Sequence, residues 1–566
     1  WGSIDLNIPS QSSPTGSQFL PAVGVALGLK LGQKKERAEQ KVLRCVYVSA
    51  GEGACAEGDF HEALNWASKD RLPIVFVIHN NQWAISVNFK ELWCADSISK
   101  ISGSYLKSYL VNGDQPASLF QVLSEARSEA ALNNSPCLVE VLVPRLCSHS
   151  ISDDQLKYRC QEEIAADLEK DPILALERIL ADHGVQAEQL RQWRDEIKTQ
   201  IDQAVISVEN ERDPDPIEIF VGGLVRDPAF EVEDSQPSSD ETVMVDAINQ
   251  ALKYMMSFND RVVVFGEDVA HGKGGVFGAT RELTSLYGVD RCFNSPLAES
   301  SIVGVAIGLA LVGFKPVVEI QFGDYIWPAL NQIRNELATL SYRSKGDFKA
   351  PVVIRVPVGG YIRGAFYHSQ NIEATFTHFP GLVVVMPSNA ADAYGLLISA
   401  IETQNPVLFL EHKGLYRSPA ARSCVRGRVP LGKARVVRTG SDLSLISYGY
   451  TLHKCVYVAK QIEDQLGKSV EVIDIRTLYP LDYETILNSV SKTGRVVIVH
   501  EDNLFMGYGA ELAAIIADEC FTKLDAPVRR VAGLDVPGIC QAPSLERVIL
   551  PDDAKIYNAV VEVLNF

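Results

Sequence analysis

The sequence predicts an α/β fold with three doubly wound domains, each built on a mostly parallel sheet, and three observations support this prediction. Short apolar runs, such as residues 262–265 (VVVF) and 496–499 (VVIV), indicate strands that are buried on both faces, because such strands lack polar alternation. Amphipathic helical stretches separate the runs, which is the order of elements in a parallel sheet. The length of 566 residues is enough for several domains, and 46% hydrophobic and 22% charged residues are typical of a globular protein.

Changes in composition divide the chain. Residues 209–241 are rich in Asp, Pro, Ser and Glu and lack periodicity, which is typical of a linker. The α/β pattern starts again after this linker and breaks once more near residue 421. We therefore expect domains over residues 1–208, 242–420 and 421–566.

Each expected domain has its own set of strands. The charged helical stretch 156–205 is expected to cover the sheet of the first domain, and the turn Asp474-Ile475-Arg476-Thr477 to lie at a domain interface. The expected strands are residues 44–49, 74–78 and 136–143, then 262–265, 316–322, 352–356, 382–386 and 407–411, and finally 443–448, 470–475, 496–499 and 528–531.

The net charge, the cysteines and the length of the apolar runs argue against some classes of binding partner and of location. The net charge of −18 argues against nucleic acid or an anionic membrane as a general partner. The eleven cysteines include no CxxC pair, which favours reduced, mostly buried thiols and a cytoplasmic location. No apolar run approaches the roughly 20 residues that a membrane-spanning helix needs.

Two strand ends carry groups that suit a hard cation. Glu52 follows the strand at 44–49, and Asn81 follows the strand at 74–78. A right-handed crossover brings both to the same edge of a parallel sheet, where α/β proteins bind ligands. A carboxylate, an amide oxygen and backbone carbonyls suit Mg²⁺ or Ca²⁺ with positions left open for phosphate oxygens. The alternative is that Glu52 only stabilises the amino end of the helix that follows it.

Backbone amides near Glu52 could bind the phosphate itself. They belong to a glycine turn and to the start of a helix, both of which present N–H groups to anions. The residues concerned are Gly51, Gly53, Ala54 and Glu57.

Together these residues resemble the diphosphate-binding motif of thiamine diphosphate enzymes, which is usually Gly-Asp-Gly, a helix and then Asn-Asn. In their order, this motif and five further blocks are similar to a fusion of the α and β chains of the decarboxylating component of 2-oxo acid dehydrogenase complexes. The resemblance covers essentially the whole chain and implies transketolase-like domains. The blocks are His149-Ser150-Ile151-Ser152-Asp153-Asp154, Gly266-Glu267-Asp268-Val269-Ala270, Pro296-Leu297-Ala298-Glu299, Gln321-Phe322-Gly323-Asp324-Tyr325 and Tyr367-His368-Ser369-Gln370.

The resemblance implies cofactors, partners and an assembly. Thiamine diphosphate would bind with Mg²⁺, which Glu52, Asn81 and the backbone carbonyl of Trp83 would hold. A structural K⁺ in the second domain is also among the implied cofactors. The partners would be a 2-oxo acid substrate and the lipoylated dihydrolipoyl acyltransferase component, and the chain would form a homodimer.

The resemblance also assigns chemistry to five side chains. Glu299 would hydrogen-bond the aminopyrimidine of the cofactor, although it could instead be a first-turn glutamate stabilised by the helix dipole. His149 and His368 would move protons, which imidazole does near neutral pH, although loop histidines are often only solvated. Glu267 would form a local salt bridge or join an acidic link between paired sites. Tyr325 would lie near the aminopyrimidine or form an aromatic wall.

The substrate remains open between members of the family. The segment Ser152-Asp153-Asp154 and the Gly-Glu-Gly variant resemble branched-chain members, which implies 3-methyl-2-oxobutanoate as the substrate. Pyruvate and acetoin are alternatives within the family, and a non-catalytic scaffold is an alternative of another class. Relatives carry a Tyr-Arg pair before the point that corresponds to Trp1, so either the sequence is incomplete or part of that site is lost. Ser150 aligns with a residue that is phosphorylated in some relatives.

Overall fold

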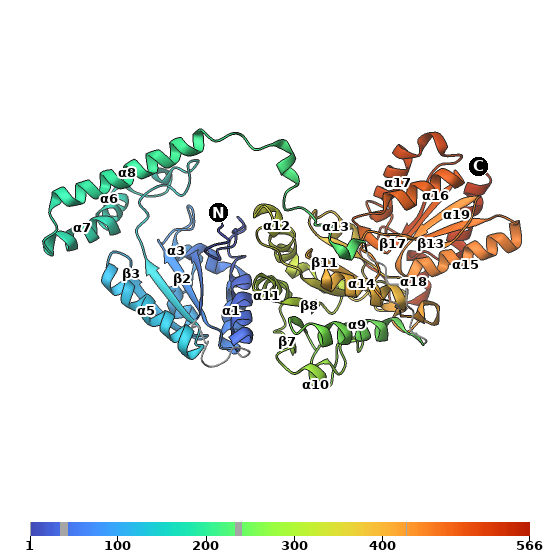
Figure 1. Ribbon diagram of the computed structural model, residues 1–566, viewed down its shortest axis with the longest axis horizontal. Coiled ribbons are helices and arrows are strands. Elements are labelled where there is room, and N and C mark those ends of the chain that lie inside the picture. The colour runs from blue at the N-terminus through green and yellow to red at the C-terminus, as the bar shows by residue number, and fades with distance from the viewer. Residues whose placement is uncertain (1, 34–43, 232–239, 426) are drawn as a thin grey trace. The chain divides into compact units, whose positions relative to one another are not determined.

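The computed structural model describes residues 2–33, 44–231, 240–425 and 427–566. They form two compact units, one made of Ser12–Val221 and the other of Gly222–Phe566 with the residues that precede Ser12. Both units consist of mostly parallel sheets covered by helices (Figure 1), so the predicted α/β class is confirmed. Residues 232–239 of the expected linker lie outside the described residues, and the domain bounds stay a prediction.

The first unit has a four-stranded parallel sheet in the order β1-β2-β4-β3. Three of its strands were predicted, whereas β3 was missed because its edge position leaves most of its residues exposed or half-exposed. The strands are β1 (Val46–Gly51), β2 (Ile74–Asn80), β3 (Lys107–Asn112) and β4 (Cys137–Leu142).

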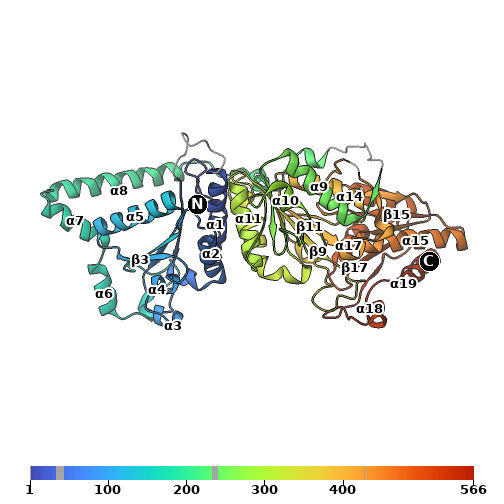
Figure 2. The same cartoon turned by 90° about the horizontal axis from the view of Figure 1, so that it is seen from below.

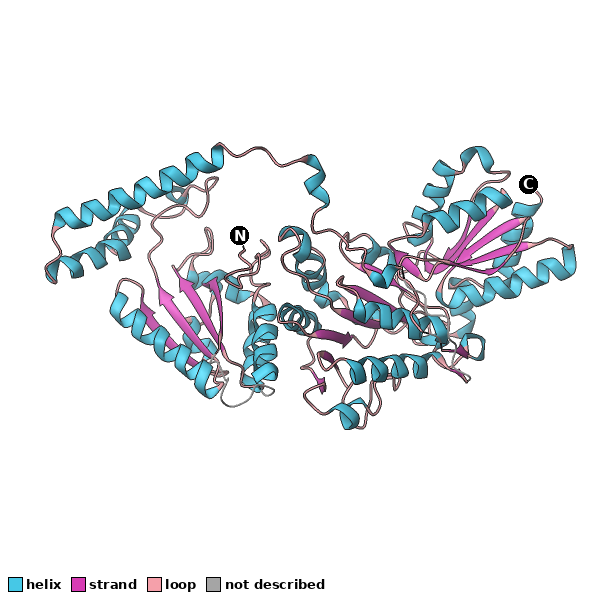
Figure 3. Ribbon diagram, viewed as in Figure 1, coloured by secondary structure: helices cyan, strands magenta, loops and turns pink. Residues whose placement is uncertain are grey.

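Helices cover both faces of this sheet (Figure 3). On one face α5 (Pro116–Asn133) packs against a cluster that includes Val75 and Val77. Residues of a strand point alternately to opposite faces, so Phe76 lies on the other face. There its ring contacts Phe19 of α1 (Phe19–Gln33), which in turn contacts α2 (Gly58–Lys69).

The helices that follow do not cover the sheet. The structure has α6 (Gln161–Glu169), α7 (Pro172–Asp182) and α8 (Ala187–Glu209), which Figure 2 draws. None of their residues is buried. The expectation that residues 156–205 cover the sheet is therefore wrong. The amphipathic pattern predicted the helices correctly, but such a pattern does not specify what the apolar face packs against.

The second unit begins with a seven-stranded sheet in the order β16-β10-β11-β9-β8-β6-β7, in which only β16 is antiparallel to its neighbour. Its main helices are α9 (Met244–Phe258), α11 (Glu299–Leu311) and α14 (Ala390–Glu402). The strands are β6 (Val262–Gly266), β7 (Cys292–Asn294), β8 (Lys315–Glu319), β9 (Val353–Val358), β10 (Val383–Val385), β11 (Val407–His412) and β16 (Thr477–Tyr479).

A five-stranded sheet in the order β13-β15-β14-β17-β18 completes the second unit. Its core lies between these strands and the helices α15 (Gly449–Leu466) and α19 (Asp553–Leu564), while α17 (Tyr508–Glu519) also packs on the sheet. The strands are β13 (Arg435–Arg438), β14 (Leu443–Ser447), β15 (Val470–Asp474), β17 (Val496–Asn503) and β18 (Arg529–Gly533).

The predicted interface turn joins the two sheets of this unit. After β15 the chain turns at Arg476, whose φ is 58°, and β16 then pairs with β10 of the seven-stranded sheet. Arg476 donates to Asp392 at 3.2 Å, and the Ser388 hydroxyl donates to Asp474 at 2.9 Å. The position of this turn at a domain interface is therefore confirmed.

Two further expectations concern the cysteines and membranes. All eleven cysteines are free thiols, but five are buried and three are exposed, so "mostly buried" was too strong. None of the helices that the structure describes has the length and apolar character required to cross a bilayer.

Candidate active site

Glu52 and Asn81 meet at the carboxyl edge of the first sheet. The neighbouring parallel strands β1 and β2 end just before them, and the Asn81 amide donates to Glu52 Oε2 at 3.2 Å. The predicted convergence is confirmed, and the role of these two residues as metal ligands stays a prediction. The expected glycine turn at residues 50–53 is instead the end of β1 followed by a 3₁₀ helix, Glu52–Ala56.

The Glu52 carboxylate has an oxygen that fits a cation. Its side chain is only 1% exposed, and among the described residues Oε1 has no hydrogen-bond donor. Burial raises the pKa of Glu52, because a low-dielectric interior disfavours the charged form, although backbone amides and the Arg145 charge oppose the shift. A bound Mg²⁺ would give this oxygen the partner that it lacks.

The neighbouring oxygens complete a hard donor set. Asn81 Oδ1 accepts from the Trp83 amide at 3.0 Å and keeps a second lone pair. The Trp83 indole donates to Glu163 at 3.0 Å and lies against the Tyr158 ring and the Arg159 guanidinium. Trp83 is thus fixed by its side chain, which also fixes the position of its backbone carbonyl.

The predicted anion-binding residues surround this corner. Gly51 ends β1, Ala54 is buried in the 3₁₀ helix, and Glu57 is the N-cap of α2. At Gly53 a Cβ atom would lie 3.0 Å from the Ala84 side chain, so only glycine fits without a shift. The amides of these short elements are therefore held close to the Glu52 carboxylate.

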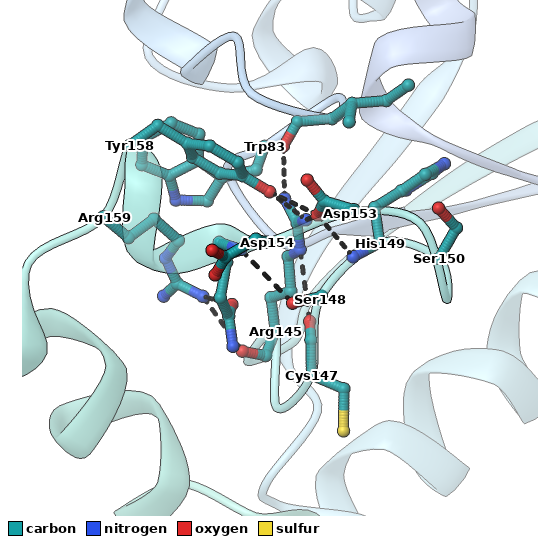
Figure 4. A network of polar contacts seen from close by, with 12 residues as sticks. Trp83, Arg145, Cys147, Ser148, His149, Ser150, Asp153, Asp154, Tyr158 and Arg159 are labelled. Carbon is teal, nitrogen blue, oxygen red and sulfur yellow. Dashed lines mark hydrogen bonds and ion pairs between the residues drawn. The ribbon is translucent and has the colours of Figure 1, made fainter.

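The His149 loop is held by a polar network that sequence reasoning missed (Figure 4). Asp153 Oδ2 accepts from the His149 amide at 2.8 Å, from the Tyr158 hydroxyl at 2.6 Å and from Arg145 at 2.8 Å. The Tyr158 hydrogen bond, backbone amides and Arg145 together hold the pKa of Asp153 below its ordinary value. The backbone of the loop is thereby fixed, while the His149 side chain is exposed. The signal for Arg145 was its position four residues before His149, at the end of an apolar strand.

A second acidic pair lies in the other unit. Glu299 is in the first turn of α11, whose residues from Ser300 to Ala310 are all buried. The Glu267 carboxylate follows β6 and accepts from the Ala298 amide, next to Glu299. Burial, and then the neighbouring Glu299 and Asp268 carboxylates, raise the pKa of Glu267 to about 7.

The alternatives for Glu267 can now be compared. A local salt bridge was one expectation, but among the described residues Glu267 Oε1 has no hydrogen-bond donor. The charged groups that act on Glu267 are mainly carboxylates instead. These neighbours argue against the salt bridge, and an acidic link between paired sites stays a prediction.

The side chains of His368 and Tyr325 are hydrogen-bonded to each other. The Tyr325 hydroxyl lies 2.9 Å from His368 Nε2, and the Phe322 ring packs edge-on against the imidazole. Like Glu267, they follow parallel strands of the seven-stranded sheet, so they lie at its carboxyl edge. A hydrogen bond of 2.9 Å between Gln321 and Asp268 ties two of these loops together.

A buried lysine beside this group was not predicted. Lys413 follows β11, is 5% exposed and lies over the Phe322 ring at 5.7 Å. Burial lowers the pKa of Lys413 to about 7, although the Asp324 carboxylate opposes the shift. The available signal was a lysine placed directly after an apolar strand.

The predicted site residues thus form two sets in different units. Glu52, Asn81, Trp83 and His149 belong to the unit Ser12–Val221. Glu267, Glu299, Tyr325 and His368 belong to the other unit. Sequence comparison assigns both sets to one family.

Three family profiles match consecutive parts of the chain. "Dehydrogenase E1 component" matches residues 5–217, "Transketolase, pyrimidine binding domain" matches 240–419, and "Transketolase, C-terminal domain" matches 432–556. A 2-oxoisovalerate dehydrogenase subunit beta of Bacillus subtilis is 45% identical over 329 residues, which cover 57% of this chain and 98% of that protein. The chain belongs to the 2-oxoisovalerate dehydrogenase family.

Two further relatives carry the same or a similar name. The subunit of the same name from Pseudomonas aeruginosa is 46% identical over 52% of this chain and 87% of its own length. A 3-methyl-2-oxobutanoate dehydrogenase subunit beta of Mycobacterium tuberculosis is 44% identical over 57% of this chain and 92% of its own length. A solved split-gene transketolase chain matches 57% of this chain and 98% of its own, with 24% identity and a TM-score of 0.47. The E1 profile and the β-subunit relatives, taken together, place an E1 part and a β-type part on one polypeptide.

The raised pKa of Glu267 predicts a dependence of stability on pH. Between about pH 4.5, the ordinary value, and about pH 7, the folded state keeps a proton that the unfolded state has lost. The free energy of unfolding should therefore fall as pH rises through this window. Glu267→Gln removes the titration, so the variant should gain in melting temperature over wild type more at pH 8 than at pH 4.5.

Differential scanning fluorimetry of the protein without added cofactor checks this. The exposed Glu211→Gln is the matched control and should show the same small difference at both pH values. A Glu267→Gln effect that does not change with pH would contradict the prediction.

Proposed function

We propose that this protein is the fused decarboxylating component of a branched-chain 2-oxo acid dehydrogenase complex. The observation that carries the proposal is the unpartnered, buried oxygen of Glu52 beside Asn81, in a chain that also holds Glu299 at the start of a buried helix. An oxygen site for a hard cation and a carboxyl for a pyrimidine are the two groups that thiamine diphosphate requires. Family membership supports the same reading.

In this proposal each set of residues suits a different part of thiamine diphosphate. Glu52, Asn81 and the Trp83 carbonyl hold Mg²⁺, and the amides around Gly53 hold the diphosphate. Glu299 hydrogen-bonds the aminopyrimidine, and Tyr325 lies beside it. When bound, thiamine diphosphate supplies the carbanion chemistry by which a 2-oxo acid loses carbon dioxide.

The protein then supplies orientation and protons. The Tyr325 hydroxyl holds the His368 ring at 2.9 Å, so this imidazole has a fixed direction in which to give or take a proton. The Asp153 network holds the loop backbone of His149, and the exposed imidazole stays free to reach a substrate. We propose that both histidines serve acyl transfer to a lipoyl group.

The partners follow from the same reaction. The acyl acceptor would be the lipoylated dihydrolipoyl acyltransferase component, and the substrate a branched 2-oxo acid. We also propose a homodimer of fused chains in the cytoplasm, because two chains would provide the two copies of each part that an α₂β₂ assembly contains.

Glu52→Ala tests the cation site. Loss of the carboxylate should weaken binding of thiamine diphosphate in the presence of Mg²⁺ by at least the roughly 10- to 100-fold that is typical even of outer-shell partners of a metal. Isothermal titration calorimetry measures the affinity, and Glu125→Ala, an exposed carboxylate on α5, is the control. Unchanged affinity in Glu52→Ala would remove the basis of the proposal.

Glu299→Gln separates binding from chemistry. The amide has the same shape but cannot exchange a proton as a carboxyl does, so the variant should bind the cofactor and lose about 10²- to 10⁴-fold in decarboxylation, the usual range for an acid–base group. Calorimetry gives the first quantity, and turnover with an artificial electron acceptor gives the second. Wild-type turnover would leave Glu299 as a first-turn residue of α11 and nothing more.

Substrate preference is the last test of this proposal. A pocket for 3-methyl-2-oxobutanoate buries two more carbon groups than one for pyruvate, each worth about 0.8 kcal/mol. The sum corresponds to roughly tenfold in specificity, since about 1.4 kcal/mol is a factor of ten. The ratio kcat/KM for 3-methyl-2-oxobutanoate should exceed that for pyruvate by at least this factor in one assay. Equal values, or a preference for pyruvate, would favour the pyruvate alternative and leave the reaction class intact.

A further inference from the structure

Two backbone carbonyls lie side by side at the carboxyl end of α14, within the second unit. The last carbonyls of a helix have no partner within the helix and carry the negative end of its dipole. At the end of α14 (Ala390–Glu402), the carbonyls of Glu402 and Thr403 both face a single cation. Clusters of carbonyl oxygens of this kind are what proteins use to bind K⁺.

The cation is the ammonium of Lys315, at the start of β8. In the sequence, Lys315 lies 87 positions before Glu402 and 88 positions before Thr403. Its Nζ donates to the Thr403 carbonyl at 2.7 Å and to the Glu402 carbonyl at 3.2 Å. Burial lowers the pKa of Lys315 to about 8, while the nearby Asp227 and Glu402 carboxylates oppose the shift. The half-buried ammonium thus has two backbone carbonyl oxygens as hydrogen-bond acceptors.

The Asp227 carboxylate acts on this ammonium through its charge. Asp227 Oδ2 accepts from the Thr403 hydroxyl at 2.7 Å and from the Gln404 amide at 2.8 Å. The Asp227 charge therefore lies against the same turn whose carbonyls face Lys315. Two helix-end carbonyls and one carboxylate form a negative site for one monovalent cation.

We propose that Lys315 is a covalently attached substitute for a monovalent cation at this site. The implied structural K⁺ therefore has no place at this carbonyl cluster, where the ammonium takes the ion's contacts. The stability of the second unit then does not depend on K⁺, because a tethered cation has no dissociation equilibrium, whereas a bound ion stabilises according to its concentration. Removal of the ammonium should create a site for K⁺ or NH₄⁺.

Thermal unfolding of the full chain in different chlorides at equal ionic strength tests the proposal. Wild type should have the same melting temperature in potassium and choline chloride. Lys315→Ala should lose several degrees in choline chloride and regain most of this loss in potassium or ammonium chloride, because the vacated space admits these ions. Lys315→Met should lose stability in every salt, because its uncharged side chain fills the space.

The control is Lys253→Ala, which removes an ammonium that pairs with the exposed Glu282 carboxylate rather than with carbonyls. Its melting temperature should not distinguish potassium from choline. Two results would overturn the proposal: a wild-type protein that K⁺ stabilises over choline, or a Lys315→Ala variant that neither K⁺ nor NH₄⁺ restores. None of these measurements requires thiamine diphosphate or activity, so they are independent of the proposed function.

Discussion

The buried charge of Arg355 fixes the sheet on which half of the candidate site stands. Arg355, in the central part of the seven-stranded sheet, is 0% exposed and donates to Glu319 of β8 at 2.7 Å and to Glu411 of β11 at 2.7 and 2.8 Å. Loss of one partner in such a buried group costs about 3–5 kcal/mol, because the remaining charges are left uncompensated. A slip of one residue would turn these side chains to the opposite face of the sheet and separate them. The triad therefore holds three adjacent strands in one register.

This register determines where the functional loops begin. Gln321 to Tyr325 follow β8, the segment with His368 follows β9, and Lys413 follows β11. Since the three strands are parallel and aligned, their loops start at one edge, and the Tyr325–His368 hydrogen bond can form between residues 43 positions apart. Glu299 belongs to the same domain but stands on the helix α11 rather than on a loop that follows a strand. The residues of α11 after Glu299 are buried, so its first turn is the part available to this carboxylate. This first turn places the Glu299 carboxylate near Glu267, where its charge adds to burial in raising the pKa of Glu267.

Sequence reasoning succeeded where a local pattern and one rule of topology were enough. Apolar runs located β1 and β2, and the right-handed crossover then placed Glu52 beside Asn81. It failed for β3, β7, β13 and β16, whose residues are too exposed or too few to form an apolar run. It also missed Arg145, Lys413 and Lys315, because the role of each of these side chains is apparent only from the groups that it contacts in the folded protein. The partners of Lys315 are backbone carbonyls, which have no sequence signal, and they lie far along the chain.

The Lys315 site also bears on how two parts can share one polypeptide. Asp227 lies at the start of the segment that enters the second unit, and Asn405, just after the Lys315 carbonyls, exchanges two hydrogen bonds with Val225 at 2.8 and 2.7 Å. The turn 403–405 thus binds the entering chain on one side and the ammonium on the other. A diffusible ion would make this anchor depend on the salt concentration around the protein. A tethered ammonium keeps the negative end of α14 neutralised at every salt concentration, so the contacts of this turn with the entering chain do not depend on a dissolved ion.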